Sequence, residues 1–267
     1  MPENSDICVP PLEDLALIRD AVRQAGAIAK AAYIANDSKR WDKSDNSPVT
    51  EADIAVNTLI QERLMAARPD YGWLSEETDD DAVRLGCERV FILDPIDGTR
   101  SFIAGHEDFA HSFAVAENGI VTAAIVHMPA KGLTFEATLG GGATLNGASI
   151  TASSADVMEA ATTLAAKPMM DQKHWPGGVP PIKRSFRSSL AYRLSLVANG
   201  RFDAMFTFRP AWEWDVAAGH LICTEAGADV FDVQGGVPTY NSAGAKTAGM
   251  IACAPGLSAD LKARAKG

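Results

Sequence analysis

Two carboxylates at the end of an apolar run give the first chemical signal in this sequence. Asp94 and Asp97 stand three residues apart and directly follow the apolar segment 90–93. Pro95 fixes one backbone φ angle and Gly98 permits a tight turn, so this stretch can hold both acids in fixed positions. Carboxylate and carbonyl oxygens are the ligands that Mg²⁺ prefers. The pattern therefore indicates a divalent-cation site, although an isolated pair of Asp residues is also typical of a turn.

The atoms next to these acids could bind a phosphate group. The Ile96 carbonyl lies between the two Asp residues and can point from the same turn. The backbone N–H groups of Gly98 and Thr99 could receive a phosphate oxygen, above all where a helix begins at these residues. Ligands in layered α/β folds commonly bind at a sheet edge, beyond a buried strand, so this segment is a candidate for such a site.

Two further acidic segments lie elsewhere in the chain. Glu76 and Glu77 follow a short apolar stretch, and the acids of residues 76–81 are otherwise typical of a solvated loop. Asp215 begins a segment of small residues with a helical pattern, where a lone Asp most often caps the helix. Each segment alone therefore has an ordinary structural explanation.

Charge counting predicts what these acids would need if they met in space. The acids in question are Glu76, Asp94, Asp97 and Asp215. Four such carboxylates would sum to −4, and crowded carboxylates would not all ionise. Two Mg²⁺ ions would bring the cluster to zero and three would bring it to +2, which makes it an anion site. Two ions about 3.5–4 Å apart can activate a water and stabilise a leaving oxygen, so we expect hydrolysis of a phosphate monoester without a covalent intermediate.

These acids are carried by alternating helix and strand patterns. Apolar residues recur at close to 3.6-residue spacing over 11–34, which predicts a helix. A second helix is expected over 47–67, with Thr50 as its N-cap and Asp53 three residues on. The other expected elements are a strand at 90–94, hairpin turns at 118–119 and 146–147, a strand near 162–167, a helix at 188–199, a strand at 202–208, a helix from 214 to about 227, a strand at 249–255 and a helix at 257–265.

This alternation predicts an α+β or layered α/β protein. The pattern restarts after about residue 150, which suggests two closely joined lobes that function as one unit. The lobe 1–150 would carry most of the metal ligands. The lobe 151–267 would carry Asp215 and the residues on the substrate side.

Composition narrows the class of function and the expected location. The formal net charge of −10 argues against binding a nucleic-acid polymer, whereas a phosphorylated small molecule stays compatible with it. The four cysteines form no C-x-x-C pair, and the chain shows neither a signal-like N-terminus nor an apolar run long enough for a membrane span. We therefore expect a cytoplasmic protein that does not bind membranes. The apolar content permits a homodimer.

Three motifs together resemble a known family. D-P-I-D-G-T at 94–99, S-E-E at 75–77 and W-D-V-A-A-G at 214–219 occur in the order and at the separations of the inositol monophosphatase-like family of Mg²⁺-dependent, lithium-sensitive phosphatases. S-P-V-T-E-A-D at 47–53 and T-E-A-G-A at 224–228 fit too, so the resemblance covers most of the chain. It implies a layered αβαβα sandwich, two or three Mg²⁺ ions per site, and frequent dimers.

The resemblance also implies roles for individual residues. Glu76, Asp94 and the Ile96 carbonyl would hold one ion, and Asp94, Asp97 and Asp215 would hold a second. Glu76 could share a third, weaker ion, with Glu77 nearby. Gly98 and Thr99 would bind phosphate oxygens, and Asp97 and Asp215 would also face the substrate. Asp53 would pair with the Thr99 hydroxyl and help to orient the attacking water, so that Glu76, Asp53 and Thr99 form the catalytic set.

Two sets of residues point to different substrate branches of this family. Segments 213–220 and 187–210 look most like the 3′(2′),5′-bisphosphate nucleotidase branch, which converts adenosine 3′,5′-bisphosphate to AMP and phosphate. Residues 100–102 are closer to the inositol-1-monophosphatase and histidinol-phosphatase branches, which are the alternatives. A regulatory or binding protein that retains the fold is a further alternative. We expect the nucleotide.

Basic residues could bind a second phosphate group of such a substrate. Arg184 and Arg209 are the candidates for a bidentate clamp, together with Arg187 and Arg193, although each alone is more often a surface charge. Lys43 could attract phosphate or be an ordinary surface lysine. The five histidines show no ligand spacing, so we expect most of them to be structural or exposed.

Overall fold

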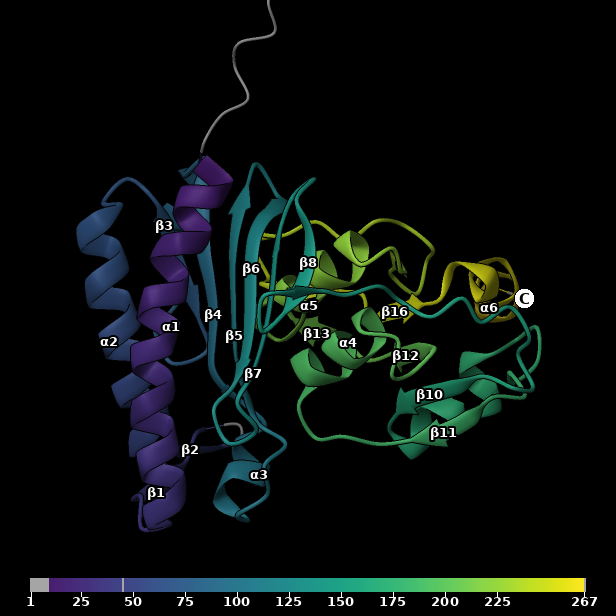
Figure 1. Ribbon diagram of the computed structural model, residues 1–267, viewed down its shortest axis with the longest axis horizontal. Helices are drawn as coiled ribbons and strands as arrows, with labels where there is room; N and C mark the ends of the chain where they lie inside the picture. The colour runs from purple at the N-terminus through teal and green to yellow at the C-terminus, as the bar shows by residue number, and fades with distance from the viewer. Residues whose placement is uncertain (1–9, 45, 267) are drawn as a thin grey trace, which may run out of the picture.

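The elements of the protein are stacked in layers (Figure 1). The structure, a computed structural model, describes residues 10–44 and 46–266. Helices α1 (Pro10–Ala35) and α2 (Glu51–Ala67) form one outer layer against a seven-stranded sheet. Helices α4 (Leu190–Ala198) and α5 (Glu213–Glu225) lie between this sheet and a five-stranded sheet, which α6 (Pro255–Lys266) covers on its far side. The order helix, sheet, helix, sheet, helix confirms the predicted αβαβα sandwich.

The seven-stranded sheet is antiparallel except for its first pair, β3 and β4, which run parallel. Both expected hairpin turns are present, because Asn118 and Gly119, and Asn146 and Gly147, adopt the positive φ angles of such turns. The strands in spatial order are β3 (Gly72–Ser75), β4 (Arg89–Asp97), β5 (Ala110–Glu117), β6 (Ile120–Met128), β7 (Leu133–Thr138), β8 (Gly142–Leu145) and β9 (Ala148–Ser149).

The five-stranded sheet is mixed, with β10 parallel to both of its neighbours. Two small ribbons, each of two strands, complete the strand set. The five-stranded sheet contains, in spatial order, β11 (Lys183–Ser185), β10 (Thr162–Ala165), β12 (Ala204–Thr207), β16 (Met250–Cys253) and β14 (Asp229–Phe231). The ribbons are β1 (Arg40–Asp42) with β2 (Pro48–Thr50), and β13 (Ala211–Trp212) with β15 (Lys246–Thr247).

Alternation along β4 explains why helices cover both faces of the first sheet. Phe91 and Leu93 belong to the apolar core under α1 and α2, whereas Val90 and Ile92 belong to the core around α4 and α5. A third core, which includes Phe206 of β12, lies between the second sheet and α6. All eight residues of 90–97 are buried, as expected for a strand covered on both faces.

Small residues in α5 allow this helix to approach its neighbour closely. A Cβ on Gly219 would lie 2.5 Å from Cδ1 of Leu194, so only glycine fits at this crossing of α5 and α4. The A-A-G part of the motif at 214–219 therefore has a packing function. It brings the N-terminal end of α5, with Asp215, to the middle of the sandwich.

Helix α2 begins as the pattern predicted. The Thr50 side chain accepts from the Asp53 backbone N–H, and the Asp53 carboxylate accepts from the Thr50 backbone N–H, which together form a capping box.

The chain passes from the seven-stranded sheet to the five-stranded sheet between Ser149 and Thr162. One core cluster joins both sheets, so the division at residue 150 stays a prediction. Among the described residues, no helix combines the length and apolar character needed to cross a bilayer.

Candidate metal centre and active site

A pocket of about 530 Å³ opens where the parallel strands β3 and β4 end. The side chains after these two strands meet there because the carboxyl ends of parallel neighbours lie at one edge of a sheet. Asp215 reaches the same pocket from the first turn of α5. The predicted site residues that line it are Glu76, Asp94, Ile96, Asp97, Gly98, Thr99 and Asp215.

Three of these acids form a tight cluster. Within the described chain, Asp94, Asp97 and Asp215 are the group whose ligand atoms all lie within 4.8 Å of one another. Asp94 is 1% exposed, and among the described residues its Oδ1 has no hydrogen-bond partner. A buried carboxylate oxygen without a donor is costly, and hard divalent cations bind oxygen at about 2.0–2.1 Å. The cluster therefore has the donor type and spacing that fit Mg²⁺.

The electrostatics of the cluster point the same way. Burial, followed by the charges of Glu76, Asp97 and Asp215, raises the pKa of Asp94 well above its ordinary value. Burial and then the Asp97 and Glu76 charges likewise raise the pKa of Asp215. Burial raises the pKa of Asp97 to about 6, although hydrogen bonds from Ser189 and Ala191 act against it. Without cations, these carboxylates repel one another.

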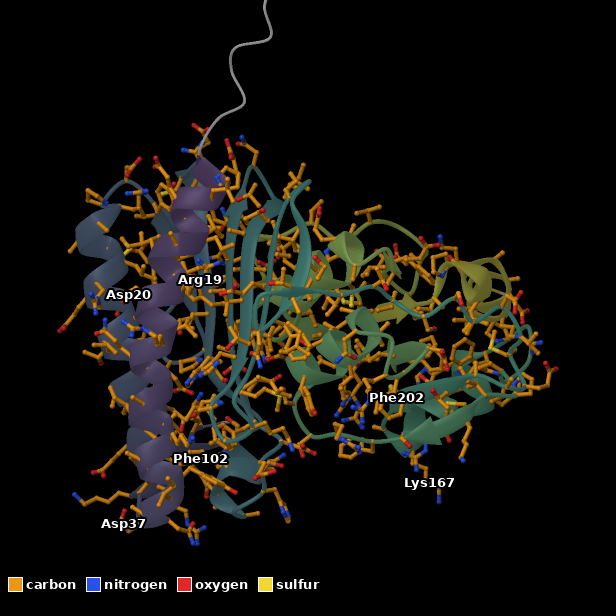
Figure 2. All side chains as sticks on the ribbon, in the orientation of Figure 1. Arg19, Asp20, Asp37, Phe102, Lys167 and Phe202 are labelled. Carbon is orange, nitrogen blue, oxygen red and sulfur yellow. The ribbon has the colours of Figure 1, made fainter. Side chains whose placement is uncertain are left out.

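A short helix at the pocket presents the predicted phosphate-binding residues. Helix α3 (Thr99–Ile103) follows Gly98, whose φ of +98° favours glycine and whose added Cβ would lie 2.9 Å from the Asp108 carbonyl oxygen. Phe102 of α3 lies beside α1 (Figure 2), with its ring centroid 6.2 Å from that of Tyr33 on this helix. The backbone N–H groups at 98 and 99 are thus held next to the acid cluster.

Thr99 connects this turn to α2. Its Oγ1 lies 3.0 Å from the Ile96 carbonyl oxygen and 3.3 Å from Asp53 Oδ1. Asp53 is fully buried, and burial raises its pKa to about 6 against the hydrogen bonds from Thr50. The structure therefore brings together the Asp53–Thr99 pair that the motif at 47–53 implied.

Lys43 forms ion pairs with the two glutamates that follow β3. Its Nζ lies 3.1 Å from Glu76 Oε1 and 2.6 Å from Glu77 Oε1. Burial raises the pKa of Glu77 to about 7, and the Lys43 hydrogen bond acts against this rise. In this arrangement the ammonium group balances part of the acidic charge at the pocket edge.

Contacts to Asp97 from the second half of the chain could not be foreseen from spacing. Ser189 Oγ and the Ala191 backbone N–H both donate to Asp97 Oδ2 at 2.7 Å. Ser189 is also the N-cap of α4, so one hydroxyl joins the start of this helix to the acid cluster. The Arg193 guanidinium stacks over the Phe186 ring and donates to the carbonyls of residues 187 and 188. Arg193 thus shapes the loop that leads into α4.

Two aromatic side chains form part of the pocket wall. Phe186 is 47% exposed and Trp212 is 38% exposed, and both line the pocket with the acids. The Trp212 ring stacks on Trp214 with centroids 4.5 Å apart, and Lys246 Nζ lies 3.8 Å from the Trp212 centroid. The sequence analysis did not identify these walls, because no spacing relates residues 186 and 212.

The predicted second-phosphate residues lie elsewhere in this structure. Arg184 and Arg209 are exposed and are not part of the pocket lining, and Arg184 donates to the Ala165 carbonyl. Arg187 pairs with Asp108 at 3.8 Å. Arg100 lines the pocket instead. Contact of Arg184 and Arg209 with substrate therefore stays a prediction.

Known proteins resemble this chain over most of its length. The model of the inositol monophosphatase family matches residues 12–264. An inositol-1-monophosphatase of Rhizobium meliloti is 36% identical over 198 residues, which cover 70% of this chain and 73% of that protein. The 3′(2′),5′-bisphosphate nucleotidase CysQ of Escherichia coli is 31% identical over 205 residues, or 72% and 79% of the two chains. The crystal structure of SuhB from Bartonella henselae superposes with a TM-score of 0.82 at 27% identity, covering 96% of this chain and 99% of that one. Another relative, at 31% identity, carries the name histidinol-phosphatase.

Proposed function

The chain belongs to the inositol monophosphatase family, whose members are phosphatases that hydrolyse phosphate monoesters, and on this premise we propose that its substrate is a 3′(2′),5′-bisphosphate nucleotide. Adenosine 3′,5′-bisphosphate, converted to AMP and phosphate, is the expected example. The observation that carries the proposal is the pocket itself. It combines the acid cluster of Asp94, Asp97 and Asp215 with the aromatic faces of Phe186 and Trp212.

The acid cluster supports Mg²⁺-dependent chemistry. Asp94, Asp97 and Asp215 would hold the ions, with Glu76 and the Ile96 carbonyl completing a site for two or three of them. When bound, such ions activate a water, polarise the phosphoryl group and neutralise the departing oxygen. Their charge would also remove the mutual repulsion that raises the pKa values of the carboxylates.

The protein groups around the cluster would position the phosphoryl group. Gly98 and Thr99 line the pocket, and their N–H groups would donate to phosphate oxygens. The Thr99 hydroxyl donates its proton to Asp53 or to the Ile96 carbonyl, which leaves the Thr99 Oγ1 lone pairs free to orient a water. Asp53 is held in turn by the capping box of α2, so its carboxylate cannot turn away.

The aromatic walls support a nucleotide over a smaller ester. A nucleobase that stacks on an aromatic side chain contributes about 1–3 kcal/mol, whereas inositol offers no flat face. Trp214 stacks on the Trp212 ring and Lys246 Nζ lies 3.8 Å from its centroid, so a base that stacks on Trp212 would displace the Lys246 ammonium group. Inositol 1-phosphate is the second candidate, because the R. meliloti inositol-1-monophosphatase has a higher identity than the nucleotidase relative. The cytoplasmic location and the homodimer stay predictions.

A substrate panel tests this proposal. Phosphate release from adenosine 3′,5′-bisphosphate, inositol 1-phosphate and histidinol phosphate would be measured with Mg²⁺, with EDTA and with added Li⁺. We expect Mg²⁺-dependent, Li⁺-sensitive release with the highest kcat/KM for the bisphosphate, and none from a parallel Asp94→Asn preparation. A higher kcat/KM for inositol 1-phosphate would overturn the nucleotide assignment, and Mg²⁺ binding without hydrolysis would support a binding protein.

A further inference from the structure

Strand β4 departs from regular pairing at the acid cluster. Along the β4–β5 ladder, Asp94 pairs with Ser112 and Asp97 pairs with Ala110, so β4 uses three steps where β5 uses two. Residues three apart in a regular strand point to opposite faces. The extra residue of this β-bulge is therefore what allows Asp94 and Asp97 to face the same pocket.

His111 lies opposite this bulge, between the two paired positions on β5. Its Nδ1 is hydrogen-bonded to the Pro95 carbonyl oxygen, and because a carbonyl only accepts, Nδ1 carries the proton. The side chain is fully buried, and within the described part of the chain its Nε2 has no partner. The bond to Pro95 is thus the ring's single polar contact there. It satisfies a carbonyl in the segment where the bulge disturbs the ladder.

The His111 ring packs against a second histidine, His127. His127 pairs with His111 across β5 and β6, and the two rings stack with centroids 5.9 Å apart. His127 Nδ1 lies 2.9 Å from Thr134 Oγ1. Helix α1 passes over this pair at Gly26, where an added Cβ would lie 2.6 Å from His127 Nε2. Glycine inside a helix costs about 1 kcal/mol relative to alanine, so its use here indicates that the room for this ring matters.

The neighbouring residue on β5 positions the other half of the cluster. Ser112 Oγ donates to the Trp214 carbonyl oxygen at 2.7 Å, one residue before Asp215. Successive side chains of a strand point to opposite faces, so His111 acts on the β4 bulge from one face and Ser112 acts on α5 from the other. Adjacent residues of strand β5 therefore hold the β4 acids and the start of α5 in a fixed relation to each other.

We propose that His111 is a positioning residue of the metal centre, whose Nδ1–H holds the Pro95 carbonyl and thereby sets the relation between Asp94 and Asp97 that a divalent cation requires. The proposal rests on the metal site of the proposed function. Removal of groups that orient metal ligands typically weakens metal binding about 10- to 100-fold. His111 is not part of the pocket lining, so its loss should act on metal affinity through Asp94 and Asp97.

Mg²⁺ affinity of purified, EDTA-stripped protein tests the proposal directly. Calorimetric titration would compare wild type with His111→Leu, which has no donor, and His111→Asn, which keeps a shorter N–H donor. We expect a dissociation constant about tenfold or more higher for His111→Leu and an intermediate value for His111→Asn. At saturating Mg²⁺, KM for the substrate should stay near the wild-type value, with the loss appearing in the Mg²⁺ requirement.

The matched control is His127→Phe, which keeps a stacked ring but does not contact Pro95. It should bind Mg²⁺ like wild type even if its Tm falls. Wild-type affinity in His111→Leu, or an equal loss in His127→Phe, would overturn the proposal. If His111→Leu does not fold, the Mg²⁺ dissociation constants of His111→Asn and His127→Phe are compared by the same criterion. Wild-type protein that binds Mg²⁺ but hydrolyses no ester would overturn the proposed function and leave this test intact.

Discussion

Two groups of acids flank the start of helix α5, and they are stabilised in opposite ways. Glu213 is fully buried, and its carboxylate accepts from the Asn241 N–H at 2.6 Å, the Ser242 N–H at 2.9 Å and the Ser242 hydroxyl. Asp215, two residues along the same helix, lies against Asp94 and Asp97. Donors of the chain thus satisfy the Glu213 carboxylate, whereas the acid cluster keeps one carboxylate oxygen, Asp94 Oδ1, without a donor among the described residues.

The comparison shows how a buried acid can be assigned to structure or to a site. A carboxylate removed from water needs donors or a counter-charge. Asp203 resembles Glu213, because its carboxylate accepts from Ser153 Oγ, from the Thr162 N–H and from the Thr162 hydroxyl. Asp94 keeps an oxygen without a donor among the described residues. A buried acid that keeps an oxygen without a donor in the described part of the chain therefore fits the proposed cation site better than a purely structural role.

The largest expected effect comes from Asp94→Asn. This change removes a carboxylate that both proposed ion sites share, so kcat/KM should fall by several orders of magnitude. In EDTA at pH 8, however, the variant should unfold at the same or a higher temperature than wild type, because a charge leaves a repulsive buried cluster. Phosphate release and scanning calorimetry measure the two effects.

Near-normal turnover of Asp94→Asn would show that the shared-ligand assignment is wrong. A lower Tm in EDTA would contradict the comparison itself, because Asp94 would then be stabilising the metal-free fold. Adding Mg²⁺ sharpens the result. It should raise the Tm of wild type and leave that of Asp94→Asn nearly unchanged.

Glu213→Gln should lower the stability of the fold, in contrast to Asp94→Asn, which should lower activity. The amide places an N–H₂ group against backbone donors, which leaves at least one of them unsatisfied. We expect a loss of about 2–3 kcal/mol in the free energy of unfolding, or roughly 5–10 °C in Tm for a chain of this size. The matched control is Asp215→Asn on the same helix, which should lose activity without this fall in Tm. Equal Tm values for the two variants would remove the distinction.

Local signals in the sequence were enough for much of the fold. The capping box at Thr50 and Asp53 and the Asn-Gly hairpin at 118–119 depend on residues a few positions apart, and both are present. Element bounds were less exact. The strand predicted at 90–94 continues to Asp97, because a bulge lets β4 stay paired with β5 past Pro95.

The supports of the site could not be predicted in the same way. The Ser189 contact to Asp97 spans 92 residues, and the His111 contact to Pro95 depends on the register of two strands. Neither has a spacing that a single sequence displays. Most histidines were expected to be structural or exposed because they show no ligand spacing, and His111 is indeed buried. Its contact with the backbone between two acids has no signal in the sequence.

Trp212→Ala tests the substrate side of the pocket. Loss of one stacking face should raise KM for adenosine 3′,5′-bisphosphate about tenfold, in line with about 1–3 kcal/mol per stacked base. KM for inositol 1-phosphate, which has no base, should change little and is the internal control. Equal increases in KM for both esters would mean that Trp212 shapes the acid cluster and not the leaving-group site. That result would weaken the contrast between the acid cluster and the aromatic wall of the pocket.

Arg209→Ala should give the smallest change in KM, and it tests whether the substrate site extends as far as Arg209. Arg209 is exposed and outside the pocket lining, so it could reach a second phosphate group only through a flexible side chain. A contact of that kind is an exposed ion pair worth at most about 1 kcal/mol, or roughly a fivefold change in KM. We expect a rise of that size or less for the bisphosphate and none for a monophosphate, measured against Arg201→Ala, another exposed arginine. Equal changes in KM for the two classes of ester would exclude Arg209 from this role and point to Arg100, which lies within the lining.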